Sequence, residues 1–339
     1  MRGREQVYPI FWTPFPRRGP RICRTTVPIW APTAPAAGVV VVSWTMAILL
    51  STPAPPELPA VAQALGAWQV EGCPVQLHPG DLGWAWQIGA PALVSRLRTW
   101  SRGGRTLAVG FQDGASLLRM AIDPELALDA KLAEQLAADV ADPRRGVLPA
   151  GEASVEARFG ETLRQRLKED GWSPGELWTS LERGLAQAVE DPGLRIEVVT
   201  PELAQERVAV QNASFGTSRF TEERWHTMAA GPLYAQARCL LAYDGAGRAV
   251  ATATVWSAGR GRPGLIEPMG VHRAHRGKGY GQAITVASAL FLRRLGASTA
   301  VVCAETANKG AVATYCAAGF RPLPVIADFQ RGRFERAPI

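Results

Sequence analysis

The chain has 339 residues, of which 47% are hydrophobic and 20% are charged, so it is long enough for two folded domains and is not a disordered polyelectrolyte. Its five cysteines form no CxxC pair and its four histidines are dispersed, which argues against structural zinc or a disulfide framework and favours a reducing, cytoplasmic location. Most of the net charge of +7 comes from the arginines of residues 1–45, and the remainder is nearly neutral. Because no basic stripe is interleaved with aromatic residues, we expect no nucleic-acid partner.

Residues 1–57 are interpreted as an extension that precedes the folded body. The first 45 residues are rich in Pro, Arg and Trp without an amphipathic period, and residues 38–50 form a continuous apolar run. Three explanations remain open: translation begins at Met46, the segment is a disordered tail, or it is a signal peptide or anchor. The apolar run is shorter than the ~20 residues of a membrane span, so we favour the first explanation and expect no membrane association.

Residues 58–192 are expected to form a first α/β domain that ends at the turn signal Asp191-Pro192-Gly193. The predicted elements are a helix at 91–101, strands at 106–111 and 117–122, and helices at 123–140, 155–168 and 174–189. The compact aromatic segment 78–86 (HPGDLGWAW) is interpreted as a packed strand and turn rather than a substrate site.

Residues 193–339 are expected to form a second α/β domain. Its predicted elements are a strand at 194–199, helices from 201 and from 221, strands at 238–243, 249–257 and 264–271, a helix at 279–295, a strand at 299–304, a helix at 309–317, and short strands near 319–330.

The most informative stretch is residues 265–283, LIEPMGVHRAHRGKGYGQA. A predicted strand runs into Gly277, Gly279 and Gly281, and a predicted helix follows at once. Glycines let backbone N–H groups turn toward an anion, and the helix N-terminus adds a partial positive charge. The stretch therefore predicts a phosphate or pyrophosphate site. It is not a P-loop or a dinucleotide fingerprint, because neither GxxxxGK[ST] nor the required βαβ context is present.

This stretch resembles the acyl-CoA-binding loop of the GNAT superfamily of N-acetyltransferases, whose pattern Arg/Gln-x-x-Gly-x-Gly/Ala is matched by Arg276, Gly279 and Gly281. A second signature follows in the right order, since Asn308, Tyr315 and Gly319-Phe320 resemble the Asn…Tyr…Gly-Phe segment of the family. The resemblance covers residues 194–330 and implies an α/β GNAT fold for the C-terminal domain.

The resemblance also implies direct transfer of an acetyl group from acetyl-CoA to an amine, without a metal. The family's cofactor contacts fall on the backbone of Met269 and Val271 for the pantetheine arm, on Asn308 for the same arm, and on Arg276, Gly277, Lys278, Gly279, Tyr280, Gly281 and Gln282 for the pyrophosphate. Tyr315 would protonate the leaving thiolate. Glu267 is the candidate general base, and a strand-end charge in water is the alternative interpretation of this residue. The acceptor amine and the oligomeric state are not readable from the sequence.

The first domain resembles, more weakly, a degenerate second copy of the same fold. Its strand at 117–122 is followed by Asp123-Pro124-Glu125 instead of a glycine-rich loop, and these acidic side chains would repel a pyrophosphate. The expected protein is thus a tandem GNAT acetyltransferase with one active copy. Two alternatives stay open: an acetyltransferase like mycothiol synthase, and an acyl-CoA-binding sensor or scaffold without turnover.

Overall fold

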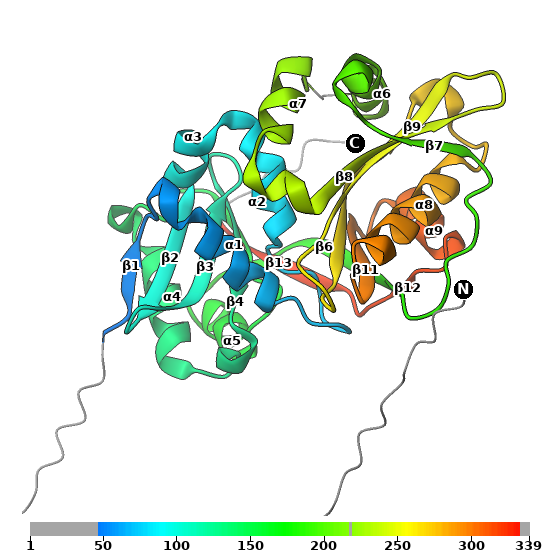
Figure 1. Ribbon diagram of the computed structural model, residues 1–339. Coiled ribbons are helices and arrows are strands. Elements are labelled where there is room, and N and C mark those ends of the chain that lie inside the picture. The colour runs from blue at the N-terminus through cyan, green and yellow to red at the C-terminus, as the bar shows by residue number, and fades with distance from the viewer. Residues whose placement is uncertain (1–46, 217–218, 333–339) are drawn as a thin grey trace, which may run out of the picture. The chain divides into compact units, whose positions relative to one another are not determined.

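The computed structural model describes residues 47–216 and 219–332, all of which belong to one compact unit (Figure 1). The interpretations of residues 1–45 lie outside the described residues. Among the helices that are described, none is both long and apolar enough to cross a membrane. Below, residues 47–192 are called the N-terminal half and residues 193–332 the C-terminal half.

One mixed sheet runs through both halves. In spatial order its strands are β1 (Leu49–Ser51), β2 (Leu97–Arg102), β3 (Arg105–Gln112), β4 (Leu117–Ile122), β5 (Ala153–Glu156), β13 (Ile326–Arg331), β6 (Ser173–Gly184), β11 (Thr299–Glu305), β10 (Gly264–Val271), β9 (Ala249–Trp256), β8 (Ala237–Tyr243) and β7 (Arg195–Val198), and the short β12 (Arg321–Pro322) pairs with β6. The strand order is similar in the two halves: most neighbours are antiparallel, and each half has one parallel pair. This pair is β4 with β5 in the N-terminal half and β10 with β11 in the C-terminal half.

Helices cover both faces of the sheet (Figure 1). They are α1 (Leu58–Ala67), α2 (Pro79–Ala85), α3 (Ala90–Ser95), α4 (Ala130–Ala141), α5 (Glu161–Glu169), α6 (Ala204–Ser214), α7 (Glu222–Ala229), α8 (Tyr280–Arg294) and α9 (Lys309–Ala317). In the C-terminal half, α8 and α9 share one apolar core with the sheet, and α6 and α7 share another core on the opposite face. The site described below lies where these two layers meet the N-terminal half.

The two halves exchange their last strands. β13, at the end of the C-terminal half, pairs with β5 of the N-terminal half, and β6, the last strand of the N-terminal half, pairs with β11. Phe329 of β13 is 2% exposed and belongs to the apolar core that α4 and α5 cover. The exchange therefore joins the halves through backbone hydrogen bonds and a shared core. The domain boundary expected near residue 192 falls between β6 and β7 and stays a prediction.

Several predicted elements are confirmed, among them β3, β4 and the sequence of strands and helices from β7 to α9. The predicted helix at 174–189 is wrong, because residues 173–184 form the long strand β6. β6 receives backbone hydrogen bonds from β13 on one side and β11 on the other, and this non-local pairing outweighs a local helical spacing of apolar residues.

In the N-terminal half, three further helices have other bounds than predicted, and one segment predicted as a strand and turn is a helix. The helix predicted at 91–101 ends at Ser95, since β2 begins at Leu97 and pairs with β1 and β3. The helix predicted at 155–168 begins only at Glu161, after strand β5 and the left-handed Gly160. The helix predicted at 123–140 begins at Ala130, where the Asp129 side chain caps it. Segment 78–86 is the short helix α2, and its N-cap His78 accepts a hydrogen bond from the Gly80 N–H.

Candidate active site

The candidate site begins where two parallel strands diverge. β10 and β11 pair only at Gly264 with Ala300 and at Leu265 with Val301. β10 stays paired with β9 up to Val271, with a register break between Ile266 and Met269 that contains Glu267. An opening therefore forms between β10 and β11 beyond Leu265, with the Glu267 bulge at its start.

The edge of β10 that faces this opening carries backbone groups without a strand partner. The His272 N–H donates to the Val250 carbonyl of the β9 side at 2.9 Å. Because backbone groups alternate in direction along a strand, those of Met269 and Val271 point away from β9, toward the opening. Among the described residues no strand pairs with them there, so an extended ligand could add to the sheet edge at the two residues that the sequence singled out.

The equivalent edge in the N-terminal half is closed by the chain itself. The Asp123 N–H donates to the Leu107 carbonyl of β3, as His272 does toward β9, so the backbone of Met120 and Ile122 faces away from β3. The Leu77 N–H donates to the Met120 carbonyl at 3.2 Å, and the Ile122 N–H donates to Gln76 Oε1 at 3.0 Å. The segment before α2 therefore occupies in this half the place that is open beside β10.

The loop after β10 has the geometry of an anion site. Gly277 and Gly279 adopt φ angles of +75° and +83°, in the left-handed region that favours glycine. Gly279 is the N-cap of α8 and supplies no side-chain acceptor, so the first N–H groups of this 15-residue helix have no partner within it. A Cβ on Gly281 would lie 3.0 Å from Thr314 Cγ2, so this glycine also allows close packing of α8 on α9. These features fit a pyrophosphate held by backbone amides.

At the corresponding helix starts in the N-terminal half, the backbone N–H groups donate to the chain's own carboxylates. Asp129 Oδ1 accepts a hydrogen bond from the Leu132 N–H at 2.9 Å, and Asp123 Oδ1 accepts one from the Glu125 N–H at 3.1 Å. The amides that could bind an anion are thus already satisfied by negative groups. The acidic residues that the sequence predicted at this place are present. Their negative charge repels a phosphate, and they already accept the hydrogen bonds that a phosphate would need.

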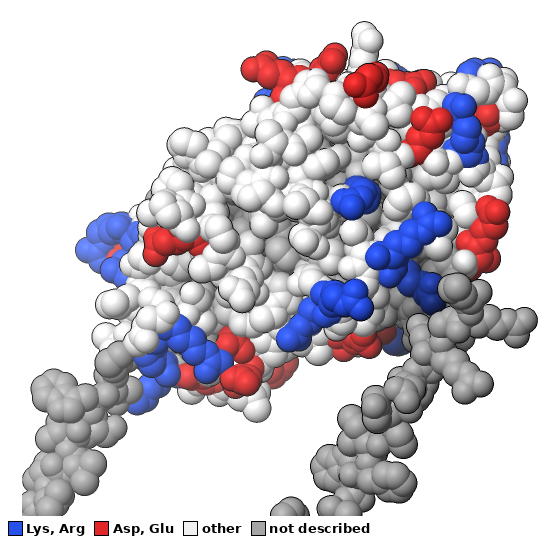
Figure 2. All heavy atoms as spheres, in the orientation of Figure 1, with Lys and Arg blue, Asp and Glu red and all other residues white. Residues whose placement is uncertain are grey.

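The polar side chains predicted to bind cofactor mostly hold the loop and helices in place. Arg276 donates to the Ser214 carbonyl at 2.6 Å, and Gln282 donates to the Ala317 carbonyl at 2.8 Å. Asn308 caps α9, with its Oδ1 accepting from the Ala311 N–H at 3.1 Å. Lys278 is exposed, and Tyr280 packs beside the core under α8. Figure 2 shows basic and acidic side chains spread over the visible face, with uncharged surface between them.

Glu267 and the buried Tyr315 lie within electrostatic reach of each other. Burial raises the pKa of Glu267 to about 7, with Arg119 lowering it and Asp81, Glu156 and Asp113 raising it. Burial also raises the pKa of Tyr315 well above its usual value, and the nearby Glu267 and Cys303 add to this effect. The carboxyl can therefore exchange a proton near neutral pH, whereas the phenol keeps its proton. At the rim, His272 packs against His275, and burial and its basic neighbours lower the pKa of His272.

Glu267 continues a row of buried polar side chains that crosses the sheet between the halves. Within this polar row Arg119 Nε lies 2.9 Å from Glu156, and Arg158 lies 3.2 Å from both Glu156 and Asp328. Arg158 Nη1 also donates to Cys303 Sγ at 3.5 Å. The members of the polar row are Arg119, Glu156, Arg158, Asp328, Cys303 and Glu267. Only Glu267 was predicted from the sequence, because the others lie on or just after strands that are distant in the chain and share no motif.

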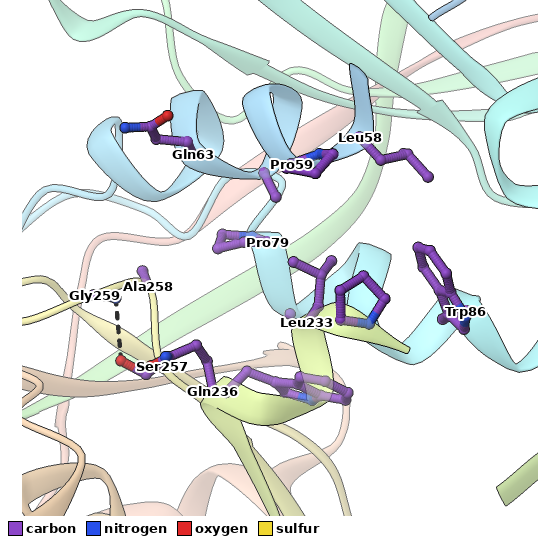
Figure 3. A pocket seen from close by; sticks show the side chains of 14 residues that line it. Leu58, Pro59, Gln63, Pro79, Trp86, Leu233, Gln236, Ser257, Ala258 and Gly259 are labelled. Carbon is purple, nitrogen blue, oxygen red and sulfur yellow. Dashed lines mark hydrogen bonds between the residues drawn. The ribbon is translucent and has the colours of Figure 1, made fainter. Parts of the chain in front are cut away.

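A mainly apolar cavity of about 310 Å³ lies beside the site, between α1, α2, the short helix η6 (Pro232–Gln236) and the end of β9 (Figure 3). Leu58, Pro79, Trp86 and Leu233 line it, and Trp256 forms its wall toward β10. Both halves therefore build this cavity. In residues 47–216 and 219–332, no group of three or more His, Cys, Asp or Glu side chains could hold a metal ion.

Comparison with known proteins agrees with this geometry. The model of the acetyltransferase (GNAT) family matches residues 202–320. A search of curated proteins found no match. The solved structures that resemble the chain include a GNAT N-acetyltransferase from Sphaerobacter thermophilus, with 19% identity over 84% of this chain and 95% of that one and a TM-score of 0.51.

Two further solved structures match this chain over nearly the whole of their own length. A tandem GNAT protein from the clavulanic acid biosynthesis pathway is 16% identical over 84% of this chain and 98% of its own, with a TM-score of 0.53. A GNAT-family acetyltransferase from Colwellia psychrerythraea is 16% identical over 83% of this chain and 99% of its own, with a TM-score of 0.53. At such identities the likeness shows the fold alone. Residues 202–320 therefore match the GNAT family of acetyltransferases, and the chain as a whole has a fold similar to that of a tandem GNAT protein.

Proposed function

We propose that this protein is an N-acyltransferase that moves an acetyl group from acetyl-CoA directly to a primary amine, at one site in the C-terminal half. The observation that carries the proposal is the contrast between the halves. The backbone of Met269 and Val271 is open beside β10, whereas the equivalent Met120 and Ile122 are hydrogen-bonded to the chain's own segment at Gln76 and Leu77. One acetyl-CoA per chain is therefore expected.

The residues present suit acetyl-CoA in two places. The unpaired backbone of Met269 and Val271 offers donors and acceptors to an extended amide-containing arm such as pantetheine. The N–H groups at the start of α8, from Tyr280 to Gln282, together with the loop at Gly277–Gly279, offer donors to a pyrophosphate. Arg276 and Gln282 keep these donors in position through their contacts with α6 and α9, and Asn308 caps α9. The thioester itself supplies an activated acyl group.

Two side chains are proposed to move protons. With a pKa of about 7, the Glu267 carboxylate can accept a proton from the acceptor's ammonium or amine near neutral pH, directly or through water. The Tyr315 phenol keeps its proton in the same pH range and can donate it to the departing thiolate. No covalent enzyme intermediate is required, since the amine is a sufficient nucleophile once deprotonated.

Calorimetric titration of the purified chain with acetyl-CoA, and separately with CoA, tests the cofactor site. We expect binding with a stoichiometry of one. The chain is then incubated with acetyl-CoA and a panel of amines that includes amino sugars, cysteinyl conjugates, polyamines and peptides, and acetylated products are identified by mass spectrometry. Absence of acetyl-CoA binding by the folded chain would contradict the proposal.

The non-catalytic alternative predicts a different outcome of the same experiment. A sensor or scaffold would bind acetyl-CoA and release no CoA with any amine of the panel. Acetylation of a cysteinyl amino-sugar conjugate would instead favour the mycothiol-synthase-like alternative. The presence of both a proton acceptor and a proton donor, Glu267 and Tyr315, supports turnover over sensing.

A further inference from the structure

The N-terminal half, whose own cleft is closed, contributes a buried cation beside the candidate site. The Arg119 side chain is 13% exposed and lies 2.9 Å from Asp81, 2.9 Å from Glu156 and 3.6 Å from Asp113. One positive charge thus faces three carboxyl groups of the same half. Such a cluster affects any further carboxyl group placed near it, because charges interact strongly where water is scarce.

Packing fixes this cluster relative to Glu267. Asp81 belongs to α2, which lies directly on Trp256: a Cβ on Gly80 or Gly83 would come within 2.5 Å of that side chain. The Trp256 Nε1–H in turn donates to the Glu267 carbonyl at 2.7 Å. The His78 ring at the start of α2 also bonds the Pro263 carbonyl at 3.2 Å, next to the first residue of β10. The helix that positions Asp81 is therefore linked to β10 through Trp256 of β9 and through Pro263, the residue before β10.

The charged and titratable groups that act electrostatically on Glu267 come from both halves. Those of the N-terminal half are Arg119 on β4, Asp81 on α2, Glu156 on β5 and Asp113 after β3, and those of the C-terminal half are Cys303 on β11 and Tyr315 on α9. Of these groups only Arg119 is a cation, and the other buried arginine of the polar row, Arg158, pairs with Glu156 and Asp328. Removal of Arg119 would leave Glu267 among carboxyl groups that all disfavour its ionised form.

We propose that Arg119 is a positioning residue of the C-terminal acyl-transfer site, through which the N-terminal half controls the protonation state of Glu267. The half without a cofactor cleft thereby sets the pH range in which the other half works. The consequence for catalysis rests on the proposed role of Glu267 as the base. The electrostatic coupling between Arg119 and Glu267 does not rest on it and can be measured separately.

The coupling is tested by nuclear magnetic resonance on the full chain with isotopically labelled glutamate carboxyl groups. The Glu267 signal is assigned by its loss in Glu267→Gln, and its titration midpoint is followed from about pH 5 to pH 9. We expect Arg119→Gln to move the midpoint upward by about 1 pH unit or more. Arg119→Lys, which keeps the charge, should leave the midpoint near that of the parent protein. Asp113→Asn removes a half-exposed carboxylate and should move the midpoint downward, by roughly half a pH unit.

Arg144→Gln is the matched control, because Arg144 is an exposed arginine of the same half that pairs only with Asp142. It should not move the Glu267 midpoint. An unchanged midpoint in folded Arg119→Gln, or an equal displacement in Arg119→Lys, would overturn the proposal. If Arg119→Gln does not fold, Asp113→Asn decides whether the charges of the N-terminal half act on Glu267: a lowered midpoint supports this control and an unchanged one refutes it.

Activity separates this proposal from the function on which it rests. If amine acetylation is detected, the acidic limb of its pH profile should move with the Glu267 midpoint in Arg119→Gln. If Glu267→Gln keeps full activity, Glu267 is not the base, yet the titration midpoints still report whether Arg119 acts on it.

Discussion

The indole N–H of Trp256 donates a 2.7 Å hydrogen bond to the carbonyl oxygen of Glu267, at the point where β10 leaves the regular register with β9. The same indole supports α2 of the N-terminal half through the close approach of Gly80 and Gly83. One ring therefore holds the bulge that carries the candidate base and also contacts the half that supplies the surrounding charges. The predictions below follow from this arrangement.

The rate of acetyl transfer should rise with pH through neutrality. Glu267 must be deprotonated to accept a proton, and its pKa of about 7 means that the active fraction grows between about pH 6 and pH 8 and then levels off. Glu267→Gln should lower kcat by about 10²- to 10⁴-fold and keep acetyl-CoA binding. The measurement is kcat/KM against pH for both proteins with the first acceptor identified. A rate independent of pH in this range would remove Glu267 from the mechanism.

The same group should make stability depend on pH. Because the folded state raises the pKa of Glu267 from 4.5 to about 7, the folded state binds this proton more tightly than the unfolded state. Its contribution to the free energy of unfolding is present below pH 4.5 and is lost as the pH rises through about 7. Urea unfolding of the parent and Glu267→Gln should show a smaller decrease between those two pH values in the variant. An equal decrease would contradict the assigned shift.

Substitution at the start of α8 should abolish acetyl-CoA binding. Gly279→Glu places a carboxylate at an uncapped helix N-terminus and strains a residue whose φ is +83°. Gly104→Glu is the matched control, since Gly104 has a φ of +81° and open space around it, in the turn between β2 and β3. Both variants should lose similar stability, about 1–2 kcal/mol. Calorimetry should show binding only in the control, and retained affinity in Gly279→Glu would refute the proposed pyrophosphate site.

Removal of one hydroxyl group should separate binding from turnover. Tyr315→Phe keeps the ring that packs against Phe320 and removes the proposed proton donor. We expect unchanged acetyl-CoA affinity and a kcat lowered by about 10²-fold or more. Tyr243→Phe is the control, because the Tyr243 hydroxyl donates to Glu206 of α6 at 2.6 Å and the residue belongs to the other apolar core of the C-terminal half. Equal rates for Tyr315→Phe and the parent protein would exclude Tyr315 as the acid.

The exchanged strand should stabilise the N-terminal half from the far end of the chain. Phe329 is 2% exposed in the core of that half, so Phe329→Ala should cost about 3–5 kcal/mol in the free energy of unfolding. Val325→Ala, at the 51% exposed residue just before β13, should cost much less. Urea unfolding of both variants measures the difference. A small loss in Phe329→Ala would show that β13 contributes little to the packing of the N-terminal half.

Local chemistry in the sequence was enough to predict the loop and the helix that we propose to hold the cofactor. The glycines at 277, 279 and 281, the strand before them and the helix after them are neighbours in the chain, and their backbone requirements are local. The second signature at Asn308 and Tyr315 likewise lies within one strand-to-helix connection. For the same reason the strands and helices of the C-terminal half were predicted almost completely.

The surroundings of Glu267 depend on contacts that no local pattern contains. Arg119, Glu156 and Asp328 become neighbours because β4, β5 and β13 lie side by side in the sheet, and β13 reaches that place only through the exchange of strands. The strand β6 was predicted as a helix because its partners are more than 100 residues away along the chain. Local spacing thus specifies where the backbone can hold a cofactor, whereas the packing of distant strands specifies the charges, and hence the proton affinity, of the group beside it.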